Sequence, residues 1–219
     1  LYKMGKLLAE QGRQEEAEKR FQEAINLDPD NQDLHYLMGR ELVARGKLEE
    51  ARTFFEDALR MNPRDARSHN DLGMLIGAKD PETALKHFET ALEVAPNFTL
   101  ALNNWGNLLL ELGRDADAEQ KYRKALEIRP ADEYAWYNLA RLAESRGQND
   151  EAVACYHKAM ENSPSNSHIP NNLGLLLWKM GRRDEALAMY RRALETDARN
   201  PLIHNNLGLA AEASGNDAE

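Results

Sequence analysis

The chain repeats itself with a period of about 34 residues, and this period restricts its fold more than any other feature. Prolines recur at steps of 33 or 34 residues, at Pro29, Pro63, Pro96, Pro130 and Pro164. Such a period is typical of arrays in which each short unit buries its apolar face only against its neighbours. The sequence therefore predicts a stack of repeats and not one globular core.

Further columns keep the same step and divide each unit into two helices. The small-residue column comes first, at Gly5, Gly39, Gly73, Gly106, Ala140, Gly174 and Gly208. Two alanine columns follow, at Ala17, Ala51, Ala84, Ala118, Ala152 and Ala186 and at Ala24, Ala58, Ala91, Ala125, Ala159 and Ala193. An aromatic column lies between them, at Phe21, Phe55, Phe88, Tyr122, Tyr156 and Tyr190. Small residues let paired helices approach closely, and the aromatic ring fills the space between units.

The predicted helices carry end signals. Glycines suited to a left-handed C-cap close the first helix of a unit at Gly12, Gly46, Gly113, Gly147, Gly181 and Gly215. N-capping side chains stand two residues after the proline column or its equivalent Ala198, at Asn31, Asp65, Asp132, Asn166 and Asn200. The third unit lacks one residue and its turn glycine, so we expect Asp80 and Pro81 to restart its second helix.

These columns resemble the tetratricopeptide repeat. The closest unit matches at Tyr134, Trp136, Leu139, Ala140, Ala152, Tyr156, Ala159 and Pro164. The resemblance covers the whole chain and implies an all-α, right-handed superhelical solenoid of stacked helix-turn-helix repeats. In that frame residues 1–219 form a single array with repeats 1–31 (partial), 32–65, 66–98, 99–132, 133–166, 167–200 and 201–219 (partial). Both ends fall inside a repeat, so we expect a piece of a longer protein.

Composition narrows the partners. With 28 Lys+Arg against 37 Asp+Glu the formal net charge is −9, which disfavours nucleic acid as a partner. No run approaches the ~18 apolar residues of a membrane span, and the first residues lack a signal-peptide profile. The single Cys155 excludes a disulfide framework, so a cytoplasmic location is the default. The glycosylation sequon at Asn97 is therefore interpreted as a chance match.

Motifs of catalysis are absent from the sequence. It contains no phosphate-binding loop, nucleophile elbow or His-Glu-x-x-His. His35, His69 and His204 share one column without a ligand pair on their helix, so packed or partly exposed side chains are favoured over metal ligands. Cys155 is interpreted as a small, half-buried apolar residue. We expect no enzyme, no metal and no cofactor.

The first helices carry a ladder of asparagines. Two residues before the small-residue column stand Lys3, Leu37, Asp71, Asn104, Asn138, Asn172 and Asn206. Three residues before it stand Tyr2, Tyr36, Asn70, Asn103, Tyr137, Asn171 and Asn205. Both columns lie on the side of the helix opposite the packing face. In the resembling family this opposite side lines the concave groove. An amide matches a peptide backbone in donors and acceptors, so the ladder predicts a peptide site. The alternative is that these asparagines only solvate the face or brace the neighbouring helix.

The ladder at Asn104, Asn138, Asn172 and Asn206 resembles the groove of the O-linked N-acetylglucosamine transferase repeat domain, while Leu37 and Asp71 depart from it. Asn103, Asn107, Asn171 and Asn205 flank the ladder, and we expect specificity from Tyr134, Tyr137, Arg141 and Trp178. The carboxylate clamp of co-chaperones is excluded, because its cations are missing around Asn103, Asn107 and Asn138.

The sequence thus predicts a non-enzymatic scaffold that binds an extended peptide segment, with a protein or peptide as partner and no membrane insertion. One alternative is the substrate-recruiting arm of a larger glycosyltransferase or other transferase, whose catalytic domain lies outside these residues. The other is a self-assembling scaffold that stacks end to end through Leu202, Ile203, Leu207 and Leu209.

Overall fold

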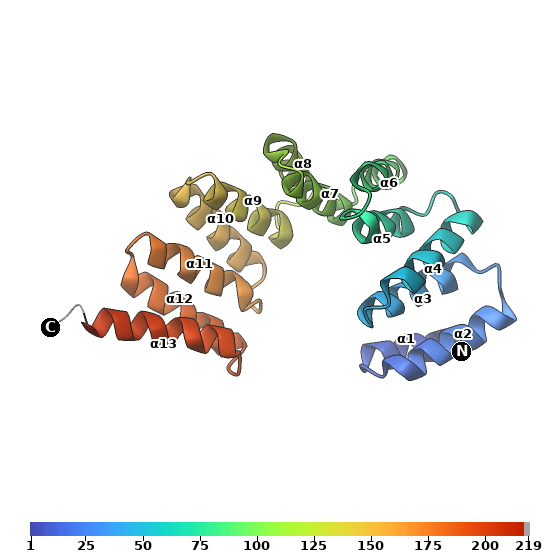
Figure 1. Cartoon of the computed structure of the whole chain (residues 1–219), viewed down its shortest axis with the longest axis horizontal. Coiled ribbons are helices and arrows are strands. Elements are labelled where there is room, and N and C mark those ends of the chain that lie inside the picture. Colours follow the sequence, from blue (N-terminus) through green and yellow to red (C-terminus); the bar gives the residue numbers. More distant parts are fainter. Residues whose placement is uncertain (217–219) are drawn as a thin grey trace. The chain divides into compact units, whose positions relative to one another are not determined.

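A computed structural model describes residues 1–216 of the chain, with side chains described as far as Ala213. In these residues all regular structure is α-helix, labelled α1 to α13 in Figure 1. The helices group into two compact units, Leu1–Leu108 and Leu109–Glu219. Of the helices described, none has the length and apolar character that crossing a bilayer requires.

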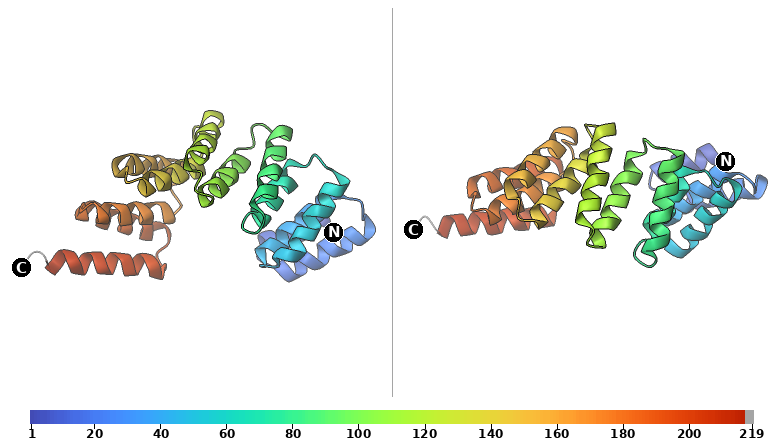
Figure 2. Two further views of the ribbon diagram at one scale, coloured as in Figure 1. Left: turned by 45° about the horizontal axis from the view of Figure 1, so that its top comes forward. Right: turned by 90° about the horizontal axis from the view of Figure 1, so that it is seen from above.

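Antiparallel helix pairs build each unit. The first unit contains α1 (Tyr2–Glu10), α2 (Gln14–Leu27), α3 (Gln32–Ala44), α4 (Leu48–Met61), α5 (Ala66–Ile76), α6 (Pro81–Val94) and most of α7 (Thr99–Glu111). The second contains the end of α7 with α8 (Asp115–Ile128), α9 (Glu133–Ser145), α10 (Asn149–Asn162), α11 (His168–Lys179), α12 (Arg183–Thr196) and α13 (Pro201–Asn216). In the second unit α11, α12 and α13 lie side by side, as both views of Figure 2 show. The prediction of an all-α repeat solenoid is confirmed.

The core of each unit consists of the predicted columns. No side chain of the aromatic column is more than 2% exposed, and the first alanine column is fully buried. The rings lie directly on the backbone of the paired helix: a Cβ added to Gly39 would lie 2.6 Å from Cε1 of Phe55. One added to Gly174 would lie 2.7 Å from Cε1 of Tyr190. At these positions of the small-residue column glycine is therefore required by the ring that covers it.

The turn glycines take the predicted backbone conformation. Gly12, Gly46, Gly113, Gly147 and Gly181 have φ of 73°, 73°, 71°, 72° and 77°, in the left-handed region that only glycine enters without strain. The prediction for Gly215 is wrong, because α13 continues to Asn216. Glycine is also compatible with right-handed helix, so it ends a helix only where the following chain turns back. The second helix expected after it lies outside the described residues.

Four of the five predicted N-caps are formed. Asn31, Asp65 and Asp132 accept hydrogen bonds from the backbone N–H of Leu34, Ser68 and Ala135 at 3.3, 3.2 and 3.0 Å. Asn200 accepts from Leu202 at 3.1 Å. The prediction for Asn166 is wrong, because α11 begins one residue later and Ser167 occupies its N-cap; Asn166 accepts from His168 at 3.0 Å, which closes the turn before the helix. Asp80 caps α6 by accepting from Thr83 N–H at 3.1 Å, with Pro81 in the first turn, as predicted for the third repeat.

Several first helices are bound to the end of the preceding repeat by a hydrogen bond from an aromatic ring nitrogen. Nε2 of His35, His69 and His204 lies 2.9, 3.1 and 2.9 Å from the carbonyl oxygens of Pro29, Pro63 and Ala198. Trp136 donates its indole N–H to the carbonyl of Pro130 at 2.9 Å in the same way. A carbonyl only accepts, so each of these nitrogens carries a hydrogen. The histidine column has a structural role at the junction between successive repeats.

A Gly39→Ala substitution tests the contact between ring and backbone. The added methyl group would overlap the buried Phe55 ring, and overpacking of this kind costs about 1–3 kcal/mol, against a gain in helix propensity of about 1 kcal/mol. We expect a net loss of stability in urea unfolding. Gly208→Ala is the matched control, because no atom lies within 4 Å of a Cβ there. Equal or greater stability of Gly39→Ala would contradict the argument.

Candidate functional site

In the second unit four polar side chains form one hydrogen-bonded chain across α13, α11 and α9. Nδ2 of Asn206 donates to Oδ1 of Asn171 at 2.9 Å, and Nδ2 of Asn171 donates to Oδ1 of Asn172 at 3.3 Å. Nδ2 of Asn172 then donates to the hydroxyl of Tyr137 at 2.7 Å. The chain therefore joins three successive first helices.

The first unit contains a chain of the same pattern. Nδ2 of Asn104 on α7 donates to Oδ1 of Asn70 at 2.9 Å, and Nδ2 of Asn70 donates to Oδ1 of Asp71 at 2.8 Å. Asp71 interacts with the hydroxyl of Tyr36 on α3. The oxygen of that hydroxyl accepts a hydrogen bond from Arg40 at 3.3 Å. In both units a residue two positions before the small-residue column reaches the residue three positions before it in the preceding repeat.

These bonds give the ladder a structural role. Asn104, Asn172 and Asn206 each use one amide N–H to hold the preceding repeat, as in the bracing alternative. A hydrogen bond of this kind contributes about 0.5–1.5 kcal/mol net. An amide nitrogen carries two hydrogens, so each bracing bond uses one of them. The ladder asparagines can therefore serve as braces and still contact a ligand.

Burial separates the predicted asparagines into two groups. Asn103, Asn138 and Asn171 are 2%, 6% and 3% exposed, so they lie beneath the surface. Asn104, Asn107, Asn172 and Asn206 are half-buried, and Asn205 is exposed. Only the second group presents side-chain surface to solvent.

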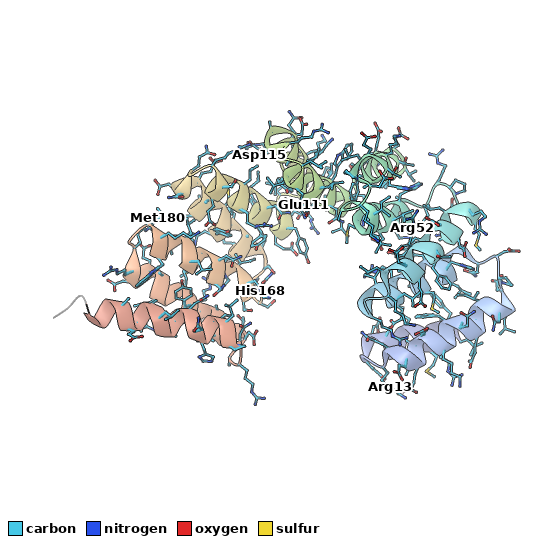
Figure 3. All side chains as sticks on the ribbon, viewed as in Figure 1. Arg13, Arg52, Glu111, Asp115, His168 and Met180 are labelled. Carbon is cyan, nitrogen blue, oxygen red and sulfur yellow. The ribbon has the colours of Figure 1, made fainter. Side chains whose placement is uncertain are left out.

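A row of exposed side chains flanks the asparagines in the second unit. It occupies the position one after the small-residue column and the position seven residues earlier, which lie on one helix face. The row contains Tyr134, Arg141, His168, Leu175, Leu202 and Leu209; the start of α11 at His168 is marked in Figure 3. Tyr134, Leu202 and Leu209 are 53%, 58% and 60% exposed, so the row presents large apolar side chains to solvent. Ile203, predicted to take part in stacking, is buried instead, and Leu207 is half-buried.

The other predicted specificity residues pack against neighbours. Arg141 lies over the ring of Tyr137, with its guanidinium carbon 5.9 Å from the centroid. Tyr137 meets the buried Tyr156 edge to face at 5.9 Å. Trp178 is half-buried beneath Arg183, whose guanidinium carbon lies 5.5 Å from its ring. Tyr137 and Trp178 are therefore held in place, whereas Tyr134 extends into solvent.

Charge is distributed differently on the corresponding face of the first unit. Burial lowers the pKa of Arg67, but hydrogen bonds to Asp33 and Asp65 at 2.7 and 3.0 Å raise it overall. Burial raises the pKa of Asp71, although the hydrogen bond from Asn70 and the charge of Arg40 oppose this. Asp71 is thus a carboxylate held at a desolvation cost in a column otherwise rich in asparagine.

The geometry defines a class of protein, the all-α solenoid of stacked helix pairs. Three family models, each described as "Tetratricopeptide repeat", match residues 8–70, 75–133 and 132–199, which together make up most of the chain. The chain belongs to the tetratricopeptide repeat family. A comparison with curated protein sequences finds no match.

Solved structures share this fold. PilW, a widely conserved type IV pilus biogenesis factor, is 18% identical over 94% of this chain and 96% of its own, with a TM-score of 0.81. A chain of the APC/C hetero-tetramer Cut9-Hcn1 is 15% identical over 94% of this chain, with a TM-score of 0.79. The present chain covers only 41% of the length of that one. YrrB, "a TPR protein with an unusual peptide-binding site", gives 22% identity, coverages of 84% and 96%, and a TM-score of 0.54. Identities this low show a common fold alone.

The sequence suggested bracing of the neighbouring helix only as an alternative, and it did not identify the partners of the bonds between repeats. The spacing in the sequence could have identified these partners. Each donor stands 34 or 35 residues after its acceptor, so a residue of one ladder column pairs with a residue of the other column in the preceding repeat. That offset pairs an amide donor with an amide or hydroxyl acceptor in both units. Reading each column separately concealed the pairing.

An Asp71→Asn substitution tests the cost of the buried carboxylate. A carboxyl group whose pKa is raised on folding binds more protons in the folded state, so it destabilises progressively as pH rises through the window between its unfolded and folded pKa. We expect the variant to unfold at a higher temperature at pH 7, by about 2–4 °C for each kcal/mol regained, with the gain shrinking towards pH 4. Circular dichroism melts at both pH values measure it.

The matched control is Asn172→Asp, the reverse change at the equivalent position of the second unit. We expect it to lower the melting temperature at pH 7 and to do so less at pH 4. A gain for Asp71→Asn that is the same at both pH values would disprove the electrostatic explanation.

Proposed function

We propose that the chain is a non-enzymatic protein-interaction scaffold that binds an extended peptide segment along the first helices of the second unit. A protein-interaction role is typical of tetratricopeptide repeat proteins, which are generally non-catalytic. The observation that carries the proposal is the row of exposed apolar side chains at Tyr134, Leu175, Leu202 and Leu209 beside half-buried amides. Contiguous exposed apolar surface rimmed by polar groups is typical of interaction sites.

The two kinds of group would divide the binding. The second N–H of Asn172 and of Asn206 would donate to main-chain carbonyls of the peptide. Leu175 and Leu209, which stand three residues after these asparagines, would contact the peptide's apolar side chains. The amides act on any sequence, so selectivity comes from the apolar row and from Arg141.

The first unit contributes in a different way. Asn104 and Asn107 are half-buried there, but the equivalents of the apolar row include Arg40, Arg67 and Met74. Its face is therefore more charged than that of the second unit. We propose that the peptide's apolar part binds the second unit. The peptide-binding site described for YrrB supports a peptide as the ligand at the level of the shared fold.

A displayed random peptide library selected on the whole chain tests the proposal. We expect enriched peptides with spaced apolar residues, and at least about tenfold weaker binding to the Tyr134→Ala, Leu175→Ala double variant, since each buried side chain contributes about 1.5–3 kcal/mol. Leu112→Ala is the matched control, because Leu112 is 42% exposed and lies in the turn between α7 and α8.

Peptides that bind the double variant as well as the original chain would exclude this face. Light scattering over a concentration series separates peptide capture from self-association through Leu202 and Leu209. A constant monomer mass would contradict the self-assembling alternative.

A further inference from the structure

A cavity of about 330 Å³ lies in the first unit between α4, α5 and α6. Its apolar lining consists of Leu48 and Leu59 on α4 and Leu72, Leu75 and Ile76 on α5. None of the residues in the hydrogen-bonded chains contributes to this lining. The cavity is therefore a separate site from the first-helix face, and its volume falls within the range of ligand pockets.

The shortened third repeat explains why the cavity is here. Helix α5 ends at Ile76, three residues after Gly73, whereas α3 ends at Ala44, five residues after Gly39. The deleted residue and the early helix end remove the last half-turn from α5, next to α4. The apolar side chains beneath are left lining an opening.

The charged side chains around the opening are already engaged with one another. Lys79 contacts Glu49 at 2.5 Å, and Arg52, labelled in Figure 3, donates to Glu56 at 2.7 Å. Asp80 accepts the Thr83 N–H as the cap of α6. The two ion pairs leave one carboxylate, that of Asp80, which already accepts a hydrogen bond. An anionic ligand would therefore lose its hydration without gaining a partner, whereas an uncharged group suits the apolar interior.

A pair of histidines supplies one directed polar group. His69 donates from Nε2 to the carbonyl of Pro63, so in the neutral ring its Nδ1 is an acceptor. That Nδ1 lies 2.8 Å from Nδ1 of His87, which must therefore carry the hydrogen and donate it. The remaining nitrogen of His87, Nε2, then has a lone pair. His87 lines the cavity with its Nδ1 edge turned to His69, so Nε2 is the nitrogen left for a ligand.

We infer that this cavity binds the indole group of a tryptophan side chain presented by a protein partner. An indole has a large apolar body that suits the leucine lining and one N–H that donates to Nε2 of His87. It has no acceptor that would need a donor from the cavity wall. The polar rim suits the peptide groups on either side of such a tryptophan. The proposal is independent of peptide binding at the first-helix face.

A pair of probes tests the inference on the whole chain at pH 8, above the ordinary histidine pKa of about 6.5. N-acetyltryptophanamide is compared with N-acetyl-1-naphthylalaninamide, which has a similar ring but no N–H, by titration followed through the methyl NMR signals of Leu59, Leu75 and Ile76. We expect the tryptophan probe to bind about two- to tenfold tighter, the range that one neutral hydrogen bond supplies. A purely apolar cavity would favour the naphthyl probe.

Variants locate the donor contact. We expect His87→Leu to reverse the preference and His157→Leu, an exposed histidine on α10, to leave it unchanged. The inference is overturned if the naphthyl probe binds as tightly as the tryptophan probe, if the lining methyl signals do not shift, or if His87→Leu keeps the preference. Binding of free indole without binding of N-acetyltryptophanamide would also overturn the assignment to a protein partner. The comparison on the unaltered chain decides even if His87→Leu does not fold.

Discussion

The contact of an aromatic ring with the bare backbone of its paired helix is the constraint on which the rest of the structure depends. Phe55 lies so close to Gly39 that a single methyl group cannot be inserted, and Tyr190 meets Gly174 in the same way. Because this contact recurs at Gly5, Gly39, Gly73 and Gly174, the helix pairs of these repeats pack alike and their first helices present equivalent positions. The hydrogen bonds between repeats need that equivalence, since an amide reaches its partner over only about 3 Å.

The candidate binding face follows from the same regularity. Amides that hold the repeats together lie between the core and an outer row of apolar side chains, so the row is supported on a braced surface. Such a face changes little when a ligand arrives, which reduces the ordering cost of binding. The cavity in the first unit has the opposite origin: it exists where the regularity is interrupted by one missing residue.

Much of the fold could be predicted from the sequence because its signals are local. The turn glycines and the caps at Asp65 and Asp132 each act within a few residues, and the period reports their repetition. The site was harder to predict. Burial distinguishes Asn138 from Asn172, although both occupy the same column, and it depends on how neighbouring helices cover each side chain. The cavity depends on where α5 ends. The tautomer of His87 depends on His69, whose own tautomer is set by the backbone carbonyl of Pro63.

The hydrogen-bonded chains also have a direction. Every hydrogen bond between repeats is donated towards the preceding repeat, and turning over one amide within the chain would set donor against donor or acceptor against acceptor. The amides of one chain are therefore free to reverse only together. In the first unit even this is prevented, because a carboxylate cannot donate: Asp71 obliges Asn70 to donate to it, which leaves the Asn70 oxygen to accept from Asn104. The carboxylate that interrupts the asparagine column gives that chain a permanent polarity, whereas the chain ending at Tyr137 is reversible, since a hydroxyl both donates and accepts.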